Sequence, residues 1–132
     1  AHPLAMVGSD GLSLDPNGPT GIGVPHPRSY GTFPRVLSRY VGSDQISIER
    51  AIQISTSVPA KKLRIPDRGL IKNGFKADLV IFDPVKISDR ATYEDPHQFP
   101  TGVNYVVVNG EIVIKNGDHM GTTPGEVLRH VN

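Results

Sequence analysis

The chain has 132 residues, which is enough for one modest domain but far short of the roughly 250 residues of a TIM barrel. Its 14 basic and 13 acidic residues leave a net charge of +1, so nothing points to nucleic acid or to a membrane surface. The absence of cysteine excludes disulfides and thiolate metal ligands, and no apolar run approaches the about 20 residues of a membrane helix. We expect a cytoplasmic protein. The N-terminus, which lacks Met and any signal-peptide pattern, predicts a chain cut from a longer one.

The first predicted element is a short buried strand at residues 4–9, which ends at Asp10-Gly11. Residues 12–30 are rich in Gly and Pro and predict a long loop of the kind that is usually functional or disordered.

Two helices follow, at residues 32–41 and 47–56, with a helical turn at 59–63. Thr32 is expected to cap the first helix, with Pro34 in its first turn, and Ser47 is expected to cap the second.

The second half of the chain is predicted to be β-rich. Strands are expected at residues 78–84, 103–108 and 111–115. Asn109-Gly110 lies between the last two and predicts a tight hairpin, because a type I′ turn needs positive φ at both central residues. Residues 124–130 are expected to form a short terminal helix.

Asp10 is the first candidate for chemistry. A carboxylate at the end of a barrel strand can bind a metal or act as a general base. By position alone, however, a simple turn residue before Gly is the favoured interpretation. Arg28 carries a planar fork of donors suited to a carboxylate, but from its position alone a solvated loop arginine is the favoured interpretation. His26 precedes Pro27 and suits a turn as well as a ligand.

The other histidines are scattered and form no ligand spacing within the chain. They are His2, His97, His119 and His130. Neither a phosphate-binding loop nor a serine nucleophile motif is present.

Two stretches resemble the C-terminal end of the amidohydrolase superfamily. Residues 7–11 resemble the eighth barrel strand with its terminal aspartate, and residues 59–83 resemble the stretch that leaves the barrel for a small β-sandwich. A narrower pattern is carried by residues 8–11, 26–35 and 95–100, including His-Pro-Arg-Ser-Tyr-Gly-Thr-Phe-Pro-Arg. This pattern resembles the N-acyl-D-amino-acid deacylases.

The resemblance implies an α/β fragment: residues 1–62 would be the last strand and helices of a TIM-type barrel, and residues 63–132 part of a β-sandwich. It implies that Asp10 moves the proton of the attacking water, that Arg28 grips the α-carboxylate of an N-acyl-D-amino acid, and that Ser9 and His26 lie nearby. Asp10 is also a candidate metal ligand. The cofactor would be zinc, held by upstream residues, so the fragment would need the rest of the barrel and be inactive alone.

Two other functions stay open. The chain could be a stand-alone β-rich binding module, or part of a cyclic-amide hydrolase of the hydantoinase or dihydroorotase type, against which the His-Pro-Arg run argues. We further expect residues 12–25 to shape specificity and residues 1–45 to be less ordered in the isolated chain. Exposed strand edges are expected to promote self-association.

Overall fold

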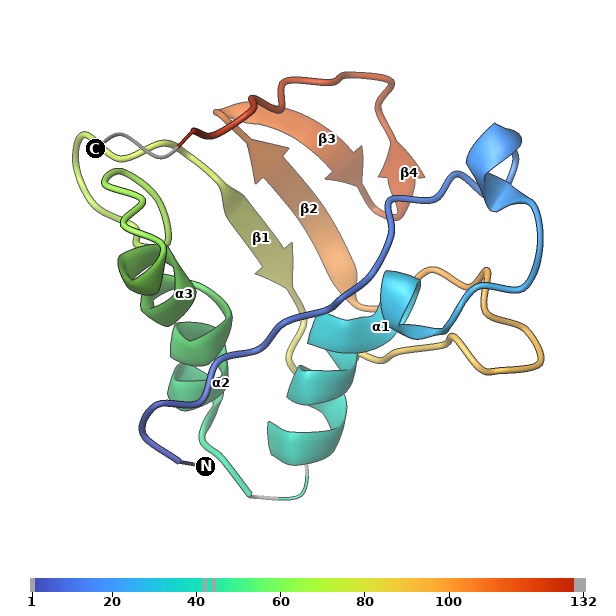
Figure 1. Ribbon diagram of the computed structural model, residues 1–132, viewed down its shortest axis with the longest axis horizontal. Helices are drawn as coiled ribbons and strands as arrows, with labels where there is room; N and C mark the ends of the chain where they lie inside the picture. The colour runs from blue at the N-terminus through green and yellow to red at the C-terminus, as the bar shows by residue number, and fades with distance from the viewer. Residues whose placement is uncertain (1, 42, 44, 130–132) are drawn as a thin grey trace.

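The chain folds as a small sheet with helices beside it (Figure 1). The computed structural model describes residues 2–41, 43 and 45–129. The helical elements are η1 (Pro19–Gly21), α1 (Arg28–Arg35), the π-helical segment η2 (Val36–Val41), α2 (Ile48–Ser55) and α3 (Ser57–Lys62). The strands are β1 (Leu79–Phe82), β2 (Val103–Val108), β3 (Glu111–Lys115) and β4 (Asp118–His119).

The four strands form one antiparallel sheet in the order β1-β2-β3-β4. The predicted hairpin between β2 and β3 is confirmed: Asn109 and Gly110 have φ of 50° and 86°, and Val108 pairs with Glu111. β4 was not predicted. It pairs with β3 through a second turn, in which Asn116 has φ of 53°.

The hairpin turn is attached to the segment before β1 by a cluster of polar side chains. The Asn109 N–H donates to Asp78 Oδ1 at 2.8 Å, and the Arg68 guanidinium binds both Asp78 and Asn109 Oδ1. Burial raises the pKa of Asp78, but the bond from Asn109 and the Arg68 charge outweigh it, so the pKa lies below its usual value. The cluster therefore stabilises the hairpin most while Asp78 is ionised.

The first long helix begins earlier than predicted. α1 starts at Arg28, after Pro27, whereas Thr32 was expected to be its cap. Thr32 lies inside the helix, where its hydroxyl donates to the Arg28 carbonyl at 3.0 Å, and Pro34 lies in the helix interior. α2 follows the prediction, since the Ser47 side chain accepts from the backbone N–H of its third residue.

The strand predicted at residues 4–9 is wrong for this structure, because the segment has no neighbouring strand to pair with. The Val7 N–H instead donates to the carbonyl of Ile54 in α2, at 2.9 Å. The terminal helix is wrong over residues 124–129, which are extended or irregular; residue 130 lies outside the described residues.

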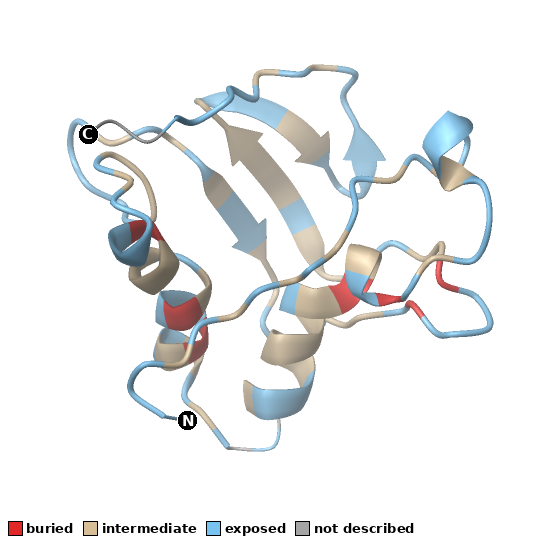
Figure 2. Ribbon diagram, in the orientation of Figure 1, coloured by how far each residue is buried: buried red, intermediate tan, exposed pale blue. Residues whose placement is uncertain are grey.

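Few residues are fully buried, and they lie away from the sheet (Figure 2). The buried hydrophobic residues are Ala51, Ile54, Ala60, Ile87 and Ala91. Val80, Ile81 and Ile112 on the strands are instead about half exposed, so the sheet lacks a covering layer over part of its surface. In the part of the chain that the structure describes, no helix combines the length and apolarity needed to span a membrane.

Candidate functional site

The Asp10-Gly11 turn is pressed against the start of α1. A Cβ on Gly11 would come within 3.0 Å of the Ser29 Cα, so a side chain at this position would crowd the backbone at the start of α1. The Leu12 N–H donates to Ser29 Oγ at 3.2 Å. Asp10 itself has φ of 48°, a left-handed conformation that aspartate tolerates better than most residues.

This arrangement brings together the two residues that the sequence singled out. The Arg28 guanidinium contacts Asp10 Oδ2 at 2.8 Å, with the side chains 44% and 84% exposed. The described residues offer Arg28 no second ion-pair partner. Because a guanidinium has five N–H donors, Arg28 can keep Asp10 on one nitrogen and still present donors to a second carboxylate.

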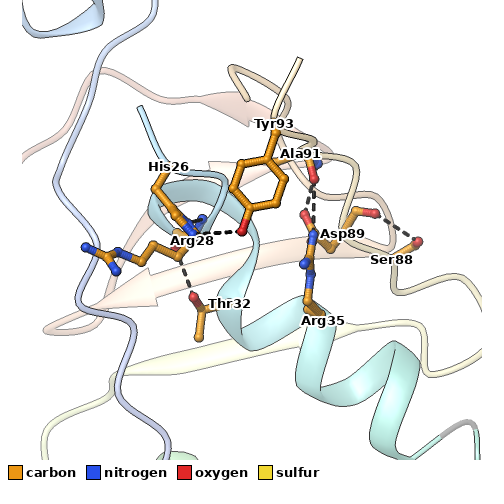
Figure 3. Close-up of polar contacts among 8 residues, drawn as sticks. All are labelled: His26, Arg28, Thr32, Arg35, Ser88, Asp89, Ala91 and Tyr93. Carbon is orange, nitrogen blue, oxygen red and sulfur yellow. Dashed lines mark hydrogen bonds and ion pairs between the residues drawn. The ribbon is translucent and has the colours of Figure 1, made fainter. Parts of the chain in front are cut away.

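Ser9 and His26 lie beside this pair. Ser9 Oγ accepts from the Gly11 N–H at 3.2 Å, and His26 Nδ1 accepts from the Arg28 N–H at 3.0 Å. The other His26 nitrogen lies 3.1 Å from the Tyr93 hydroxyl, and the two rings meet edge to face (Figure 3). Since Nδ1 accepts, the proton of the neutral ring is on Nε2 and is donated to Tyr93.

A second histidine, His97, joins three segments. Its Nε2 is 3.1 Å from the Gly23 carbonyl, which can only accept, so Nδ1 accepts from the Tyr30 hydroxyl at 2.7 Å. Burial, together with the negative charge of Asp15, raises the pKa of Tyr30. His97 was read as an isolated histidine; the structure makes it a link between α1 and the residues before it.

Asp89 ties the C-terminal part of α1 to the segment after β1 (Figure 3). Its carboxylate is 5% exposed and contacts Arg35 Nε at 2.5 Å, while Arg35 also donates to the Ala91 carbonyl at 3.2 Å. A Cβ on Gly31 would come within 1.9 Å of the Asp89 carboxylate. Glycine in the His-Pro-Arg run therefore makes room for this ion pair.

A cavity of about 640 Å³ lies elsewhere, between residues 13–20 and one end of the sheet. Neither Asp10 nor Arg28 lines it, and its wall includes Leu14, Phe99, Val103 and Ile114. Within residues 2–41, 43 and 45–129, no three His, Cys, Asp or Glu side chains gather in a way that could hold a metal ion. The described residues therefore do not by themselves assemble the three or four ligands of a protein zinc site around Asp10.

Comparison with known proteins assigns the sequence to a family. Residues 8–114 match the family model described as "Amidohydrolase family". The chain belongs to this amidohydrolase family. The superfamily resemblance read from the motifs is confirmed.

The relatives that match within this family include N-acyl-D-amino-acid deacylases. The chain is 42% identical over 130 residues to an N-acyl-D-aspartate deacylase and 39% identical over 124 residues to a D-aminoacylase, both from Alcaligenes xylosoxydans xylosoxydans. These matches cover 97% and 93% of the present chain but 24% of each relative's length. A crystal structure of the N-acyl-D-glutamate deacylase of Bordetella bronchiseptica, complexed with zinc and a phosphonate inhibitor, matches with a TM-score of 0.80 and 40% identity, over 95% of this chain and 25% of that one. The chain thus spans about a quarter of the length of the relatives it matches.

The sequence identified Asp10 and Arg28 as candidates but missed Tyr93 and Asp89. Tyr93 lies 67 residues from His26, and Asp89 lies 54 residues from Arg35. No spacing rule links residues that far apart. The one local signal was Gly31, whose missing side chain marks a close approach by another segment.

Proposed function

We propose that this chain is the C-terminal part of a zinc-dependent hydrolase that cleaves the amide bond of N-acyl-D-amino acids. The observation that carries the proposal is the contact between Asp10 and Arg28, because it places a carboxylate and a carboxylate-binding fork side by side. The deacylase relatives, at 39–42% identity, support the same substrate class.

Asp10 is proposed to act as general base and then as general acid. It takes a proton from the attacking water while the water oxygen bonds to the carbonyl carbon of the acyl group. It then passes that proton to the amide nitrogen as the C–N bond breaks, which releases a carboxylate and a D-amino acid. The exposure of Asp10 in this chain leaves its carboxylate open to substrate and to the remainder of the protein.

Arg28 is proposed to hold the α-carboxylate of the substrate. Its guanidinium already lies against Asp10, so a carboxylate bound to its remaining donors sits close to the proposed base. Ser9 and His26, which bond to the Asp10-Gly11 turn and to the start of α1, are proposed to line the substrate site. The loop at residues 12–25 is proposed to shape specificity.

The part of the chain that the structure describes does not provide a zinc site by itself. No three candidate ligand side chains gather among the described residues, whereas zinc takes three or four protein ligands. We therefore place the zinc ligands in the rest of a TIM-type barrel, to which residues 1–62 would contribute the last strand and helices, while residues 63–132 would belong to a β-sandwich. Zinc bound there would supply Lewis-acid activation of the water and the carbonyl.

The test is a zinc-supplemented assay of the full-length protein with N-acetyl-D-amino acids, their L-enantiomers and a cyclic amide. We expect turnover of the D-substrates only. Turnover of the cyclic amide alone would assign the hydantoinase or dihydroorotase class, and no turnover at all would favour a binding module.

The same assay tests Asp10. Asp10→Asn is expected to lower kcat by roughly 10²- to 10⁴-fold, the usual contribution of a general acid–base group. Asp118→Asn, on the exposed strand β4, is the matched control and should keep wild-type kcat. Near-normal turnover by the Asp10 variant would remove its proposed role.

A further inference from the structure

We propose that Tyr93 and His26 are positioning residues that fix the start of α1 and direct Arg28 toward Asp10. The inference rests on the proposed function, since it concerns how the carboxylate-binding arginine of that site is held. Among the described residues, neither Tyr93 nor His26 forms a hydrogen bond or an ion pair with Asp10. They act through the backbone of Arg28.

His26 supplies the cap that α1 otherwise lacks. The residue before the helix is Pro27, which offers no side-chain cap, and the first N–H groups of any helix lack intrahelical acceptors. The first of these belongs to Arg28 and is satisfied by His26 Nδ1 at 3.0 Å. The imidazole therefore determines where the helix starts and from which point the Arg28 side chain extends.

Tyr93 holds that imidazole in place. Its hydroxyl oxygen accepts from His26 Nε2 at 3.1 Å, and the ring centroids are 5.1 Å apart at 80°. The bond selects the tautomer in which Nδ1 is free to accept from Arg28, as partners of metal-bound or catalytic histidines commonly do. Without the hydroxyl, the ring can rotate and the Arg28 N–H loses its acceptor for part of the time.

Asp89 fixes the segment that carries Tyr93 against α1. The Asp89 carboxylate is nearly buried against Arg35 and accepts from the Ala91 N–H at 2.9 Å. The chain from Asp89 to Ala91 is thus fixed on α1 two residues before Tyr93. Tyr93 itself is 66% exposed, so apolar packing does not explain why its side chain lies on His26.

The position of the helix start matters because the guanidinium is at the end of a long, flexible side chain. Two donors must meet a carboxylate together, so small displacements of such a clamp weaken its hold on the carboxylate. Among the described side chains, Asp10 alone forms an ion pair with the guanidinium, so the backbone supplies much of its orientation.

The experiment compares Tyr93→Phe with wild type in the full-length enzyme, and measures kcat and KM for an N-acetyl-D-amino acid and for its neutral primary amide. Loss of one hydrogen bond predicts a KM for the carboxylate substrate roughly three- to tenfold higher, with kcat within about twofold. The neutral amide should show no change. Tyr105→Phe, on strand β2, is the matched control for removing a phenol hydroxyl.

A second pair of variants separates positioning from simple stabilisation. His26→Asn keeps an acceptor that can reach the Arg28 N–H, as asparagine does in turns, whereas His26→Ala keeps none. We expect Asn to recover most of the lost affinity for the carboxylate substrate. Amide hydrogen exchange over residues 26–31 of the full-length protein should accelerate in Tyr93→Phe and His26→Ala but not in Tyr105→Phe.

The outcomes are distinct. Equal losses on the carboxylate substrate and the neutral amide, or unchanged exchange over residues 26–31 in Tyr93→Phe, would overturn the positioning role while leaving the deacylase function in place. Wild-type protein that hydrolyses neither substrate would overturn the proposed function, and with it the inference.

Discussion

The Asp10–Arg28 pair contributes little to folding and much to the chemistry that we propose. An exposed ion pair stabilises a protein by about 0–1 kcal/mol, and both side chains here are largely open to solvent. Asp10 also adopts a left-handed backbone conformation, and such local strain persists where its surroundings enforce it. The next residue, Gly11, lies close to the Ser29 backbone, so the turn packs tightly against the start of α1.

Replacement of Arg28 by Lys separates charge from geometry at this site. Lysine keeps the positive charge but loses the planar fork, so it can hold a carboxylate at one point only. We expect the KM of the full-length enzyme for an N-acetyl-D-amino acid to rise at least about tenfold, the loss of one charge-assisted hydrogen bond. A neutral amide substrate should be affected much less.

The control for this prediction is Arg64→Lys, an exposed arginine beyond α3. Equal rises in KM for the charged and the neutral substrate in Arg28→Lys would count against the clamp.

At the scale of residues, the sequence predicted Asp10 and Arg28 as site candidates but not the side chains that position Arg28. Asp10 and Arg28 were found because each occurs in a local motif with a chemical meaning. Tyr93 and Asp89 carry no motif, and their roles depend on a contact that exists only after the segment following β1 folds back onto α1.

At the scale of elements, the sequence predicted structure correctly where a single turn or helix cap determines it. The Asn109-Gly110 hairpin and the Ser47 cap need only neighbouring residues, and both are confirmed. The start of α1 was misplaced because Thr32 looks like a cap. The real beginning is set by His26 and Pro27, and Thr32 instead bonds back to the Arg28 carbonyl within the helix.

The polar cluster of Arg68, Asp78 and Asn109 at the hairpin turn predicts that the stability of the protein depends on pH. Because folding lowers the pKa of Asp78, its contribution to stability is complete above its unfolded pKa of about 4 and is lost as the pH falls through the folded value. Asp78→Asn should therefore destabilise the full-length protein at pH 7, by about 1 kcal/mol after allowance for partial exposure. The gap in Tm between variant and wild type should narrow below about pH 4.

Glu111→Gln, at the other side of the same turn, is the matched control for this measurement. A Tm gap for Asp78→Asn that stays constant from pH 7 to pH 3 would show that the Asp78 charge is not what anchors the hairpin.

At the scale of the whole molecule, the thin core is the main feature. Among the residues that the structure describes, none in a strand is fully buried, and large apolar side chains on β1 and β3 face solvent. A chain that spans about a quarter of its relatives has few neighbours with which to cover such surfaces. The same shortage explains why residues 4–9 do not form the predicted strand. A strand needs a neighbouring strand for its backbone groups, whereas here the Val7 N–H bonds to α2 and the Ala5 N–H bonds locally to the His2 carbonyl.

The 132-residue chain on its own is expected to fold without becoming active. It should show no zinc-dependent deacylase activity, because its described residues do not gather the three or four ligands that zinc takes. Amides of residues 4–9 should exchange rapidly, since they lack strand partners, while those of β2 and β3 should be the best protected. Hydrogen exchange and size-exclusion chromatography measure both points. Strong protection at residues 4–9 in a monomer would mean that the segment is stable without a barrel. The same protection in a dimer would show that a second copy of the chain covers the open strand edges and the exposed apolar strands.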